Sequence, residues 1–579
     1  MKYNLIDRVN RFIHRIVGRK KEPWYKYYSN NDKINYPNLT IYGLLEKTAL
    51  TYPYNFAYEY YGKKVTYREF IAKIKKTASS LMELGVKSGD RVTICMPNTP
   101  VAIITFYAIN MLGATASMIH PLSSANEIEF YLKESNSKYI LTIDLVYDKV
   151  SSVIDNTNVE KIIVSSVSDD MKKAKSALYW FFSGRKNKIE KNDKAIFYSE
   201  LLKLGVYDKD FNGTILDKDH EAVILYSGGT TGSPKGIILS NLNFNALAMQ
   251  LQKAVDDTAK AGNSILAVLP IFHGFGLAVS IHTPLYIGMK VIFVPDFSPR
   301  KFGGLIKKYN PNFIIGVPTL YEALLKTKLR RNDLSHLTCA VSGGDTLSPE
   351  FKQTIDKFLK EHGSKTTVRC GYGLTESTGA VCLNPRREYR DNSIGIPLPD
   401  MDFKIVKIGT KQQAGFNEDG EICISGPSVM KKYLNNKEET DKVKIKHNDG
   451  KIWLHTGDIG CMDKDGFVYF KQRLKRMIVS SGYNIYPSYM EEVICKQKYV
   501  DTCCVIGILH PYKKQVPKVY IVLKKEYKLN NTIKKEIKKY CEENFVRYSW
   551  PYEYEYRDKL PQTLVGKIAY RELEKEVGE

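Results

Sequence analysis

In the segment "AVILYSGGTTGSPKGIILSNLNFNALAMQ", residues 222–250, an apolar run leads into a glycine-rich loop. The first five residues of this segment form a continuous apolar, β-rich run, which is typical of a buried strand. Its final part becomes helix-like from Ile237 onward, and Ser240 is a residue type that favours the N-cap position of a helix. Between the two parts lie four glycines, four hydroxyl residues and a lysine. The loop therefore connects a buried strand to a second element.

The composition of this loop indicates what it binds. Glycines permit positive φ and close backbone approach, and successive N–H groups in such turns form a concavity that binds anions. Lys235 supplies a positive charge, so the expected guest is a phosphate. The nucleotide-kinase P-loop is a poor fit, because it places Ser or Thr directly after Gly-Lys, whereas Gly236 follows Lys235 here. A flexible surface loop is the alternative.

Strand-like runs alternate with helical ones over most of the chain, which predicts an α/β fold with largely parallel sheets. From about Lys404 shorter β-like pieces follow, and beyond about Lys475 the pattern indicates a small α+β domain. The strand-like runs are "RVTICMP", "YILTID", "KIIVSS", "AVILYSG", "SILAVLP", "KVIFVP", "FIIGVP" and "CAVSGG".

Charge and cysteine content narrow the class of protein. Lys and Arg number 86 against 63 Asp and Glu, and the net charge of +23 raises the question of a nucleic acid or an anionic membrane as partner. No zinc-finger spacing or RNP-type aromatic motif is present, so no specific nucleic-acid binding is expected. The ten cysteines include no C-x-x-C pair, which argues against a zinc site and a disulfide framework and favours a reduced, cytoplasmic protein.

The longest uncharged run, residues 101–119, is long enough to raise the question of a transmembrane helix. Asn110 interrupts it, and Gly113 predicts a helix end before the β-like "ATASMIHP". We therefore expect a buried helix followed by a strand.

The N-terminus has a basic amphipathic pattern. Apolar residues recur at helical spacing within residues 1–21, and arginines and lysines lie on or beside the other face. This is typical of a helix that lies in a membrane interface, and the basic-aromatic segment 171–188 adds to the pattern. The alternative is that both segments pack on the protein's own body.

Seven motifs occur in a fixed order along the chain. They are "SGGTTGSPKG" (227–236), "PIFHGFGL" (270–277), "VSGGDTLS" (341–348), "GYGLTES" (371–377), "HTGDIG" (455–460), "QRLKRMIVSSGYNIYP" (472–487) and "LPQTLVGKIAYREL" (560–573). Together they resemble the adenylate-forming superfamily, which includes acyl-CoA synthetases, firefly luciferase and the adenylation domains of peptide synthetases. The resemblance runs from about Asn38 to about Leu573.

The resemblance implies an architecture and a two-step reaction. Residues 1–37 would be an N-terminal extension, 38–474 a large domain of α/β subdomains with a β-rich subdomain, and 475–579 a small mobile domain. A carboxylate would attack the α-phosphate of ATP to give an acyl-adenylate and pyrophosphate, and a thiol would then take the acyl group and release AMP. Such chemistry depends on positioned cations and hydrogen-bond donors.

The resemblance assigns the nucleotide site to several motifs. Thr230, Thr231 and Lys235 would hold the β- and γ-phosphates. Tyr372 would face adenine, Thr375 would bind the α-phosphate, and Glu376 would bind Mg²⁺, which prefers oxygen ligands. The "VSGGDTLS" turn would contact adenine mainly through backbone. Its residues are Gly343, Gly344 and Asp345, and Asp345 stands where many relatives carry a small residue.

The remaining assignments concern the ribose, the domain movement and the acid. Asp458 would accept hydrogen bonds from the ribose hydroxyls, and Arg473 would be a second contact to the ribose or to a phosphate. Lys567 matches the mobile catalytic lysine, and Lys475 the hinge about which the small domain rotates. The acid would lie near "FHGFGL": His273 matches a gate beside the acyl pocket, and a buried core histidine is the alternative reading. The pocket residues would be Gly274, Phe275 and Gly276.

The small domain departs from the family pattern at several positions. Tyr489 replaces the usual first acid of a P-x-E-x-E segment and leaves Glu491 to match the second. Val479 stands where some relatives have lysine, and Gln472 replaces the more usual Gly or Asp before Arg473. Because these residues lie where the thiol enters, the resemblance implies the second step less strongly than the first.

The sequence therefore predicts a fatty acyl-CoA synthetase for medium or long chains that uses ATP, Mg²⁺ and coenzyme A. It is expected in the cytoplasm, with peripheral contact to an anionic membrane through the N-terminus. An aryl- or bile-acid-CoA ligase and an acyl-AMP ligase that loads a carrier protein are the alternatives. A catalytically idle lipid-binding relative is a further one, against which the retained site residues argue.

Overall fold

The computed structural model describes residues 22–28, 33–182, 189, 193–206, 217–227, 234–255, 258–480, 483–562 and 568–578, without the side chains of residues 180–182, 483 and 484. Contacts between residues group the chain into two compact units. The first unit runs to Asp402 and includes Ile424–Ile445 and Asp465–Phe467. The second unit comprises Phe403–Cys423, Lys446–Lys464 and the chain from Val468 onward. The predicted domain boundary near Lys475 stays a prediction.

The first unit contains a nine-stranded sheet in the order β16-β15-β14-β13-β12-β10-β11-β1-β2. Its central pairs, from β1 to β14, are parallel, and its margins are antiparallel. The strands are β1 (Phe56–Tyr60), β2 (Lys63–Thr66), β10 (Ser264–Ala267), β11 (Lys290–Phe293), β12 (Phe313–Gly316), β13 (Cys339–Ser342), β14 (Val368–Tyr372), β15 (Cys382–Leu383) and β16 (Ile396–Pro397).

A second sheet of the same unit has eight strands in the order β19-β9-β8-β4-β3-β5-β6-β7. All of its pairs are parallel except β8–β9 and β9–β19. The parallel-rich α/β fold predicted from the alternating runs is therefore confirmed. The strands are β3 (Arg91–Cys95), β4 (Thr115–Met118), β5 (Tyr139–Ile143), β6 (Lys161–Ser165), β7 (Ala195–Phe197), β8 (Glu221–Ser227), β9 (Lys235–Ser240) and β19 (Lys432–Tyr433).

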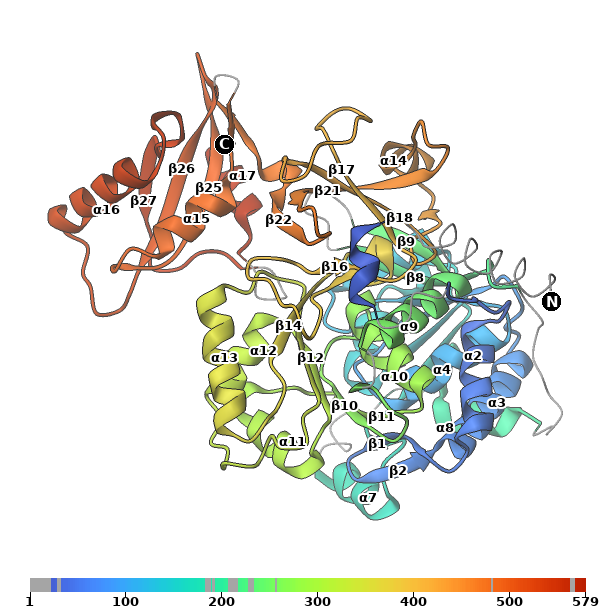
Figure 1. The fold of residues 1–579 in the computed structure, drawn as a ribbon. Coiled ribbons are helices and arrows are strands. Elements are labelled where there is room, and N and C mark those ends of the chain that lie inside the picture. The colour runs from blue at the N-terminus through green and yellow to red at the C-terminus, as the bar shows by residue number, and fades with distance from the viewer. Residues whose placement is uncertain are drawn as a thin grey trace, which may run out of the picture. The chain divides into compact units, whose positions relative to one another are not determined.

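Helices of the first unit cover these sheets (Figure 1). Helices α2, α3, α4, α9 and α10 pack on one another, and α12 and α13 contact β12 and β14. The helices are α2 (Ile41–Thr51), α3 (Tyr67–Glu83), α4 (Pro100–Met111), α5 (Ala125–Ser135), α6 (Tyr147–Ser151), α7 (Lys173–Phe182), α8 (Tyr198–Leu204), α9 (Asn241–Ala254), α10 (Thr283–Ile287), α11 (Phe302–Tyr309), α12 (Pro318–Leu325), α13 (Pro349–Glu361) and α14 (Lys437–Val443).

The long uncharged run forms α4 followed by β4, as predicted, and every residue of α4 is buried. Asn110 is satisfied inside the protein: its side-chain oxygen accepts from the backbone N–H of Tyr42, and its amide donates to Asn241. Gly113 has a φ of 73°, which suits its place just after the helix. Among the described residues, no helix is both long enough and apolar enough to cross a membrane.

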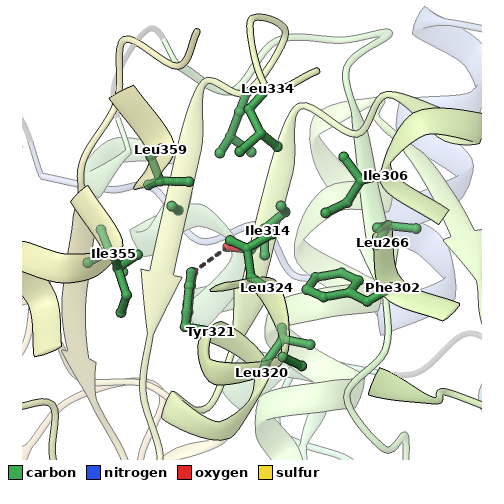
Figure 2. Packing of buried hydrophobic residues seen from close by; sticks show 14 of the residues in the cluster. Leu266, Phe302, Ile306, Ile314, Leu320, Tyr321, Leu324, Leu334, Ile355 and Leu359 are labelled. Atoms are coloured by element: carbon green, nitrogen blue, oxygen red, sulfur yellow. Dashed lines mark hydrogen bonds between the residues drawn. The ribbon is translucent and has the colours of Figure 1, made fainter. Parts of the chain in front are cut away.

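A dense apolar cluster lies between the nine-stranded sheet and helices α11 to α13 (Figure 2). The hydroxyl of Tyr321 lies within hydrogen-bond distance of two strand carbonyl oxygens, 3.1 Å from that of Ile314 and 3.0 Å from that of Val341. A buried tyrosine usually needs such a partner. This contact ties α12 to β12 and to β13, and β13 leads into the "VSGGDTLS" turn.

The second unit contains most of a sheet in the order β17-β18-β21-β20, with β22 paired to β21, and a sheet in the order β24-β23-β26-β25, with β27 paired to β26. Its helices are α15 (Pro487–Cys495), α16 (Asn531–Asn544) and α17 (Tyr570–Gly578). The strands are β17 (Asp402–Val406), β18 (Gly420–Ser425), β20 (Lys444–Lys446), β21 (Ile452–Met462), β22 (Val468–Arg473), β23 (Ile478–Ser480), β24 (Tyr483–Ile485), β25 (Val500–His510), β26 (Lys514–Leu523) and β27 (Glu553–Tyr556).

Candidate active site

The strands on either side of the glycine-rich loop form an antiparallel pair. Ser227 at the end of β8 pairs with Lys235 at the start of β9. Thr230 and Thr231 lie outside the described residues. Ser240 caps α9 and accepts from the N–H of Asn243, as predicted. The interpretation of helical spacing directly after the loop needs one correction: Lys235–Ser240 form a strand, because the two apolar runs on either side of the loop pair with each other.

Lys235 meets a short segment that lies far from it in sequence. Strand β9 pairs with β19, which places Tyr433 opposite Ile237. The Lys235 ammonium forms an ion pair with Glu439 of α14 and lies 5.0 Å from the centre of the Tyr433 ring. The hydrogen bonds from Lys235 and Lys442 lower the pKa of Glu439 to about 2. The lysine predicted to hold phosphate is thus paired with a carboxylate.

Glu376 joins the same group of side chains. The Tyr433 hydroxyl donates to Glu376 Oε1 at 2.9 Å. The backbone oxygen of Glu376 accepts from the N–H of Met430 at 2.7 Å, which holds the turn in place. We call Lys235, Glu376, Tyr433 and Glu439 the phosphate-side cluster. It brings the lysine of the glycine loop and the acid of "GYGLTES" to a single tyrosine.

The "GYGLTES" motif begins at the end of β14 and continues into a 3₁₀ turn, Thr375–Ser377. Tyr372 and Thr375 are both half-buried. The hydroxyl of Thr378, which follows the motif, donates to the backbone oxygen of Ser428 at 2.7 Å. Backbone and side-chain hydrogen bonds therefore hold the motif close to the segment that carries Tyr433.

The "FHGFGL" motif leads into a π-helix, Phe275–His282. Such helices are rare and occur frequently at functional sites. A Cβ atom on Gly274 would lie 2.8 Å from the backbone oxygen of Thr378, so only glycine allows this approach. Gly276 is buried against the carbonyl oxygen of Pro270. The motifs proposed for the acyl pocket and the α-phosphate are thus in backbone contact.

Phe275 links this region to the "VSGGDTLS" turn. Its ring lies 3.3 Å from where a Cβ atom of Gly343 would stand, and it also approaches Gly344. Asp345 is exposed and accepts from the N–H of Thr346. His273 is half-buried, and its ring centre lies 4.7 Å from that of Phe272. The first unit therefore assembles its described site residues in one region.

Asp458 lies in the second unit, on β21. Its side chain is 1% exposed and forms an ion pair with Arg473, whose Nε lies 2.9 Å from Oδ1 of the aspartate. Arg473 is half exposed and stands opposite Asp458 on the paired strand β22. The structure thus brings together the two residues that the resemblance assigns to the ribose, and their roles stay a prediction.

A hydrogen-bond network holds the backbone next to Asp458. Glu421 on β18 accepts from the ring Nδ1 of His455 at 2.7 Å and from the N–H of Gly457 at 2.9 Å. Gly457 has a φ of 69°, which favours glycine. Thr456 donates its hydroxyl hydrogen to the backbone oxygen of Ile422 and accepts from the N–H of Asp458. We call residues 455–458 the aspartate turn.

A second histidine extends this network. The Nε2 atoms of His447 and His455 lie 2.9 Å apart, so one ring donates and the other accepts. Because His455 donates through Nδ1 to Glu421, a neutral His455 accepts through Nε2 and His447 is the donor. Burial lowers the pKa of His447, which favours the neutral form of the His447 ring.

The last two predicted residues belong to the C-terminal part of the chain. Lys475 is exposed in the 3₁₀ turn Leu474–Arg476. The next residue, Arg476, forms a two-pronged ion pair with Glu491 of α15, and Glu491 also accepts from the N–H of Val505. Lys567 lies outside the described residues.

Sequence reasoning missed four residues of these networks: Tyr433 and Glu439 in the first unit, and Glu421 and the role of His455 in the second. Tyr433 and Glu439 stand in "KKYLNNKEET", a segment that none of the seven motifs covers. Glu421 lies in "GEICISG", one of the shorter β-like pieces predicted after about Lys404. Their roles come from pairing between distant strands, for which a single sequence carries no local signal.

Comparison with known proteins identifies the class. A family model described as AMP-binding enzyme matches residues 45–434, and one described as AMP-binding enzyme C-terminal domain matches residues 489–567. Among solved structures, ATP-bound MatB from Rhodopseudomonas palustris has a TM-score of 0.80 at 21% identity, over 93% of this chain and 99% of that one. The fold is that of the adenylate-forming enzymes.

Curated relatives agree over nearly the whole chain. The long-chain-fatty-acid–CoA ligase of Bacillus subtilis is 33% identical over 562 residues, which cover 96% of this chain and 98% of that protein. The enzyme of the same name from Salmonella typhimurium is 30% identical over 543 residues, or 92% and 94% of the two chains. The chain belongs to the AMP-binding enzyme family, which confirms the predicted superfamily.

Proposed function

We propose that the chain is an ATP-dependent ligase that joins a long-chain fatty acid to coenzyme A through an acyl-adenylate, with release of AMP and pyrophosphate. The carrying observation is the phosphate-side cluster, in which Lys235 and Glu376 meet at Tyr433. A lysine beside a glycine-rich hairpin suits phosphate oxygens, and an acid nearby suits a metal that accompanies them. The curated relatives at 33% and 30% identity support fatty acids as the substrate class.

The roles in the first unit follow from this reaction. Thr230, Thr231 and Lys235 would bind the β- and γ-phosphates, for which Lys235 must exchange its partner Glu439. Thr375 would donate its hydroxyl to the α-phosphate. Tyr372 would face adenine, which the turn at Gly343, Gly344 and Asp345 would also line.

Glu376 fits a Mg²⁺ ligand. Its carboxylate is half-buried, and oxygen is the donor that this ion prefers. The Tyr433 hydroxyl donates to one carboxylate oxygen and so orients the group. Mg²⁺ would offset the negative charge of the phosphates when bound. The contribution of the chain itself is the placement of this carboxylate.

The roles in the second unit concern binding of the ribose and the change from adenylation to thioester formation. Asp458 would accept hydrogen bonds from two ribose hydroxyls, with Arg473 holding the carboxylate in place. Lys475 would be the pivot, and Lys567 would reach the two anions that must meet in the first step. A compact ammonium suits that task.

Changing Lys567 to Ala tests the enzymatic proposal. Adenylation should be nearly abolished, because two anions would then meet without the cation between them. The measurement is pyrophosphate release with fatty acid and ATP in the absence of CoA. Lys559→Ala is the matched control, since Lys559 is an exposed lysine just before the same motif. Unchanged turnover in the Lys567 variant would remove this lysine from the mechanism.

The acid itself is assigned by a substrate panel. The acyl chain would be bordered by His273, Gly274, Phe275 and Gly276. The identity of these residues does not indicate the length of the chain. AMP release is measured with straight-chain, aryl and steroid carboxylates, each with and without CoA. A CoA-dependent maximum at long straight chains is the expected result. A maximum at aryl or steroid acids, or AMP without a thioester, would favour the other ligase branches, and silence would contradict the proposal.

We also propose that the enzyme works in the cytoplasm at the surface of an anionic membrane, where it would collect its lipid substrate. The basic amphipathic pattern of residues 1–21, which lie outside the described residues, supports this contact. Deletion of residues 1–21 should weaken sedimentation with vesicles that contain anionic phospholipid. Equal sedimentation of both proteins would contradict the membrane contact and leave the catalytic proposal standing.

A further inference from the structure

A cluster of metal-ligating side chains lies in the second unit, beside the aspartate turn. Glu421 and Cys423 are two residues apart on β18, so their side chains point to the same face of the strand. His455 belongs to the neighbouring strand β21. One donor atom from each residue lies within 4.8 Å of the other two. Two strands thus bring sulfur, nitrogen and oxygen donors together.

The cluster is shielded from solvent. Cys423 is fully buried, and the side chains of Glu421 and His455 are 11% and 10% exposed. Without a cation, ionising both the thiol and the carboxylate in this buried position would cost free energy, because buried charges need a partner. A divalent cation would neutralise both.

We propose that Glu421, Cys423 and His455 form a binding site for a divalent metal ion of the Zn²⁺ class. Cysteine, histidine and glutamate are the side chains that bind Zn²⁺ in proteins, and three protein ligands leave a fourth position for water. The sulfur donor disfavours Mg²⁺ and Ca²⁺, which take oxygen ligands. Binding replaces the thiol proton of Cys423, which passes to solvent, by a sulfur–metal bond.

His447 supports this assignment from outside the ligand set. Metal-bound histidines usually donate their second ring N–H to a neighbouring group, which orients the ring. The Nδ1 of His455 already faces Glu421 and would bind the metal, while its Nε2 lies 2.9 Å from Nε2 of His447. His455 would then change tautomer and donate to His447 instead of accepting from it.

The site shares a residue with the aspartate turn. Glu421 also accepts from the N–H of Gly457, so a metal ion that draws this carboxylate away weakens the hydrogen bond next to Asp458. Metal binding and nucleotide binding are then coupled, and by linkage each changes the affinity of the other by the same factor. The metal site stands independently of the proposed function, whereas this coupling rests on it.

Cobalt titration tests the site directly. The full-length protein is freed of metal with a chelator and titrated with Co²⁺, which reports a thiolate ligand through a sulfur-to-cobalt charge-transfer band. We expect the band to saturate near one equivalent and to disappear when Zn²⁺ is added. Absence of the band in the folded protein would overturn the proposal.

Substitutions show which side chain gives rise to the charge-transfer band. Cys423→Ser should abolish the band and weaken Zn²⁺ binding by roughly 100-fold or more, since even the loss of a supporting hydrogen bond costs about 10- to 100-fold. Cys461→Ser is the matched control, a buried cysteine on β21 outside the cluster. His447→Gln should keep the band with weaker affinity, which provides a second test if Cys423→Ser does not fold. Equal Zn²⁺ affinity in all variants would mean surface binding and overturn the proposal.

AMP binding tests the coupling. Calorimetry with saturating Zn²⁺ should give an AMP affinity about fivefold lower than without metal in the original chain, and no difference in Cys423→Ser. Equal affinities in the original chain would contradict the coupling. A protein that shows the cobalt band but binds no AMP would contradict the proposed function and leave the metal site standing.

Discussion

The phosphate-side cluster and the aspartate turn, to which we assign the phosphates and the ribose, are built in opposite ways. In the first, Lys235 and Glu439 are 26% and 29% exposed, and their ion pair joins two segments far apart in sequence. In the second, Asp458 is 1% exposed and its backbone is fixed by Thr456. The first proposed site would have to exchange a partner for its ligand, whereas the second is held in place by its own hydrogen bonds and ion pair.

This difference has energetic consequences. A partly exposed ion pair is worth about 0–1 kcal/mol, so its loss to an incoming phosphate costs little. Leaving a buried polar group without its partner costs about 1–3 kcal/mol, and more when the group is charged. Substitutions in the aspartate turn should therefore change nucleotide affinity more than substitutions of Glu439, and in the opposite direction.

Among substitutions in these two regions, the largest effect is expected for Asp458→Asn. The amide can accept only through one oxygen, and the loss of hydrogen bonds to a charged acceptor of about 3 kcal/mol corresponds to a roughly 100-fold weaker AMP affinity. Calorimetric AMP binding gives the measurement. Asp463→Asn is the control, a buried aspartate near the end of the same strand that accepts from the Tyr469 hydroxyl. If both variants bind AMP equally well, the aspartate turn is no ribose site.

A smaller loss is expected for Glu421→Gln. Glutamine offers one acceptor oxygen where the carboxylate offers two, so the ring N–H of His455 or the N–H of Gly457 loses its partner. The expected cost is about 1.4 kcal/mol, or a roughly tenfold higher KM for ATP with a lesser change in kcat. Glu418→Gln is the control, since Glu418 accepts from the N–H of Gly415 in an exposed turn of the same unit.

The outcome for kcat decides what kind of residue Glu421 is. A positioning residue acts through Asp458, so its variant should resemble a mild form of Asp458→Asn in nucleotide affinity. A fall in kcat with unchanged KM, or a loss of thermal stability with unchanged AMP affinity, would contradict that role.

The same comparison explains which parts of the site were predictable from sequence. The strands around "AVILY" and "CAVSGG" and the Ser240 cap depend on neighbouring residues, so local patterns were enough. Asp458 and Arg473 stood in motifs of the resembled superfamily. Glu439 looked like any surface acid of a charged helix, because only the pairing of β19 with β9 brings it to Lys235.

The proposed metal site was not predicted from the sequence, for a related reason. The spacing of the cysteines alone argued against a zinc site, since motif searches look for ligands close together in sequence. Here Glu421 and His455 are 34 residues apart and meet through neighbouring strands. The one local signal was an acid and a cysteine two positions apart on a predicted strand.

The smallest effect, and the only gain, is expected for Glu439→Gln. Removing the carboxylate frees Lys235 for phosphate, so ATP affinity should rise by up to about fivefold, the equivalent of about 1 kcal/mol. Glu438→Gln is the matched control: its carboxylate also pairs with Lys442, but it is 81% exposed and does not meet Lys235 among the contacts of the described residues. Equal affinities in the two variants would mean that separating the Lys235–Glu439 ion pair costs no measurable free energy.

The pH dependence of that gain in ATP affinity reports the strength of the Lys235–Glu439 ion pair. Because the folded-state pKa of Glu439 is lowered to about 2, the ion pair is intact above the ordinary glutamate range near about 4.3 and is lost only as the pH falls toward 2. The ratio of ATP affinities between Glu439→Gln and the original chain should therefore be the same at pH 7.5 and at pH 4.5. A ratio that shrinks toward one at pH 4.5 would mean that Glu439 titrates like a free carboxylate, and that its pair with Lys235 is too weak to compete with phosphate.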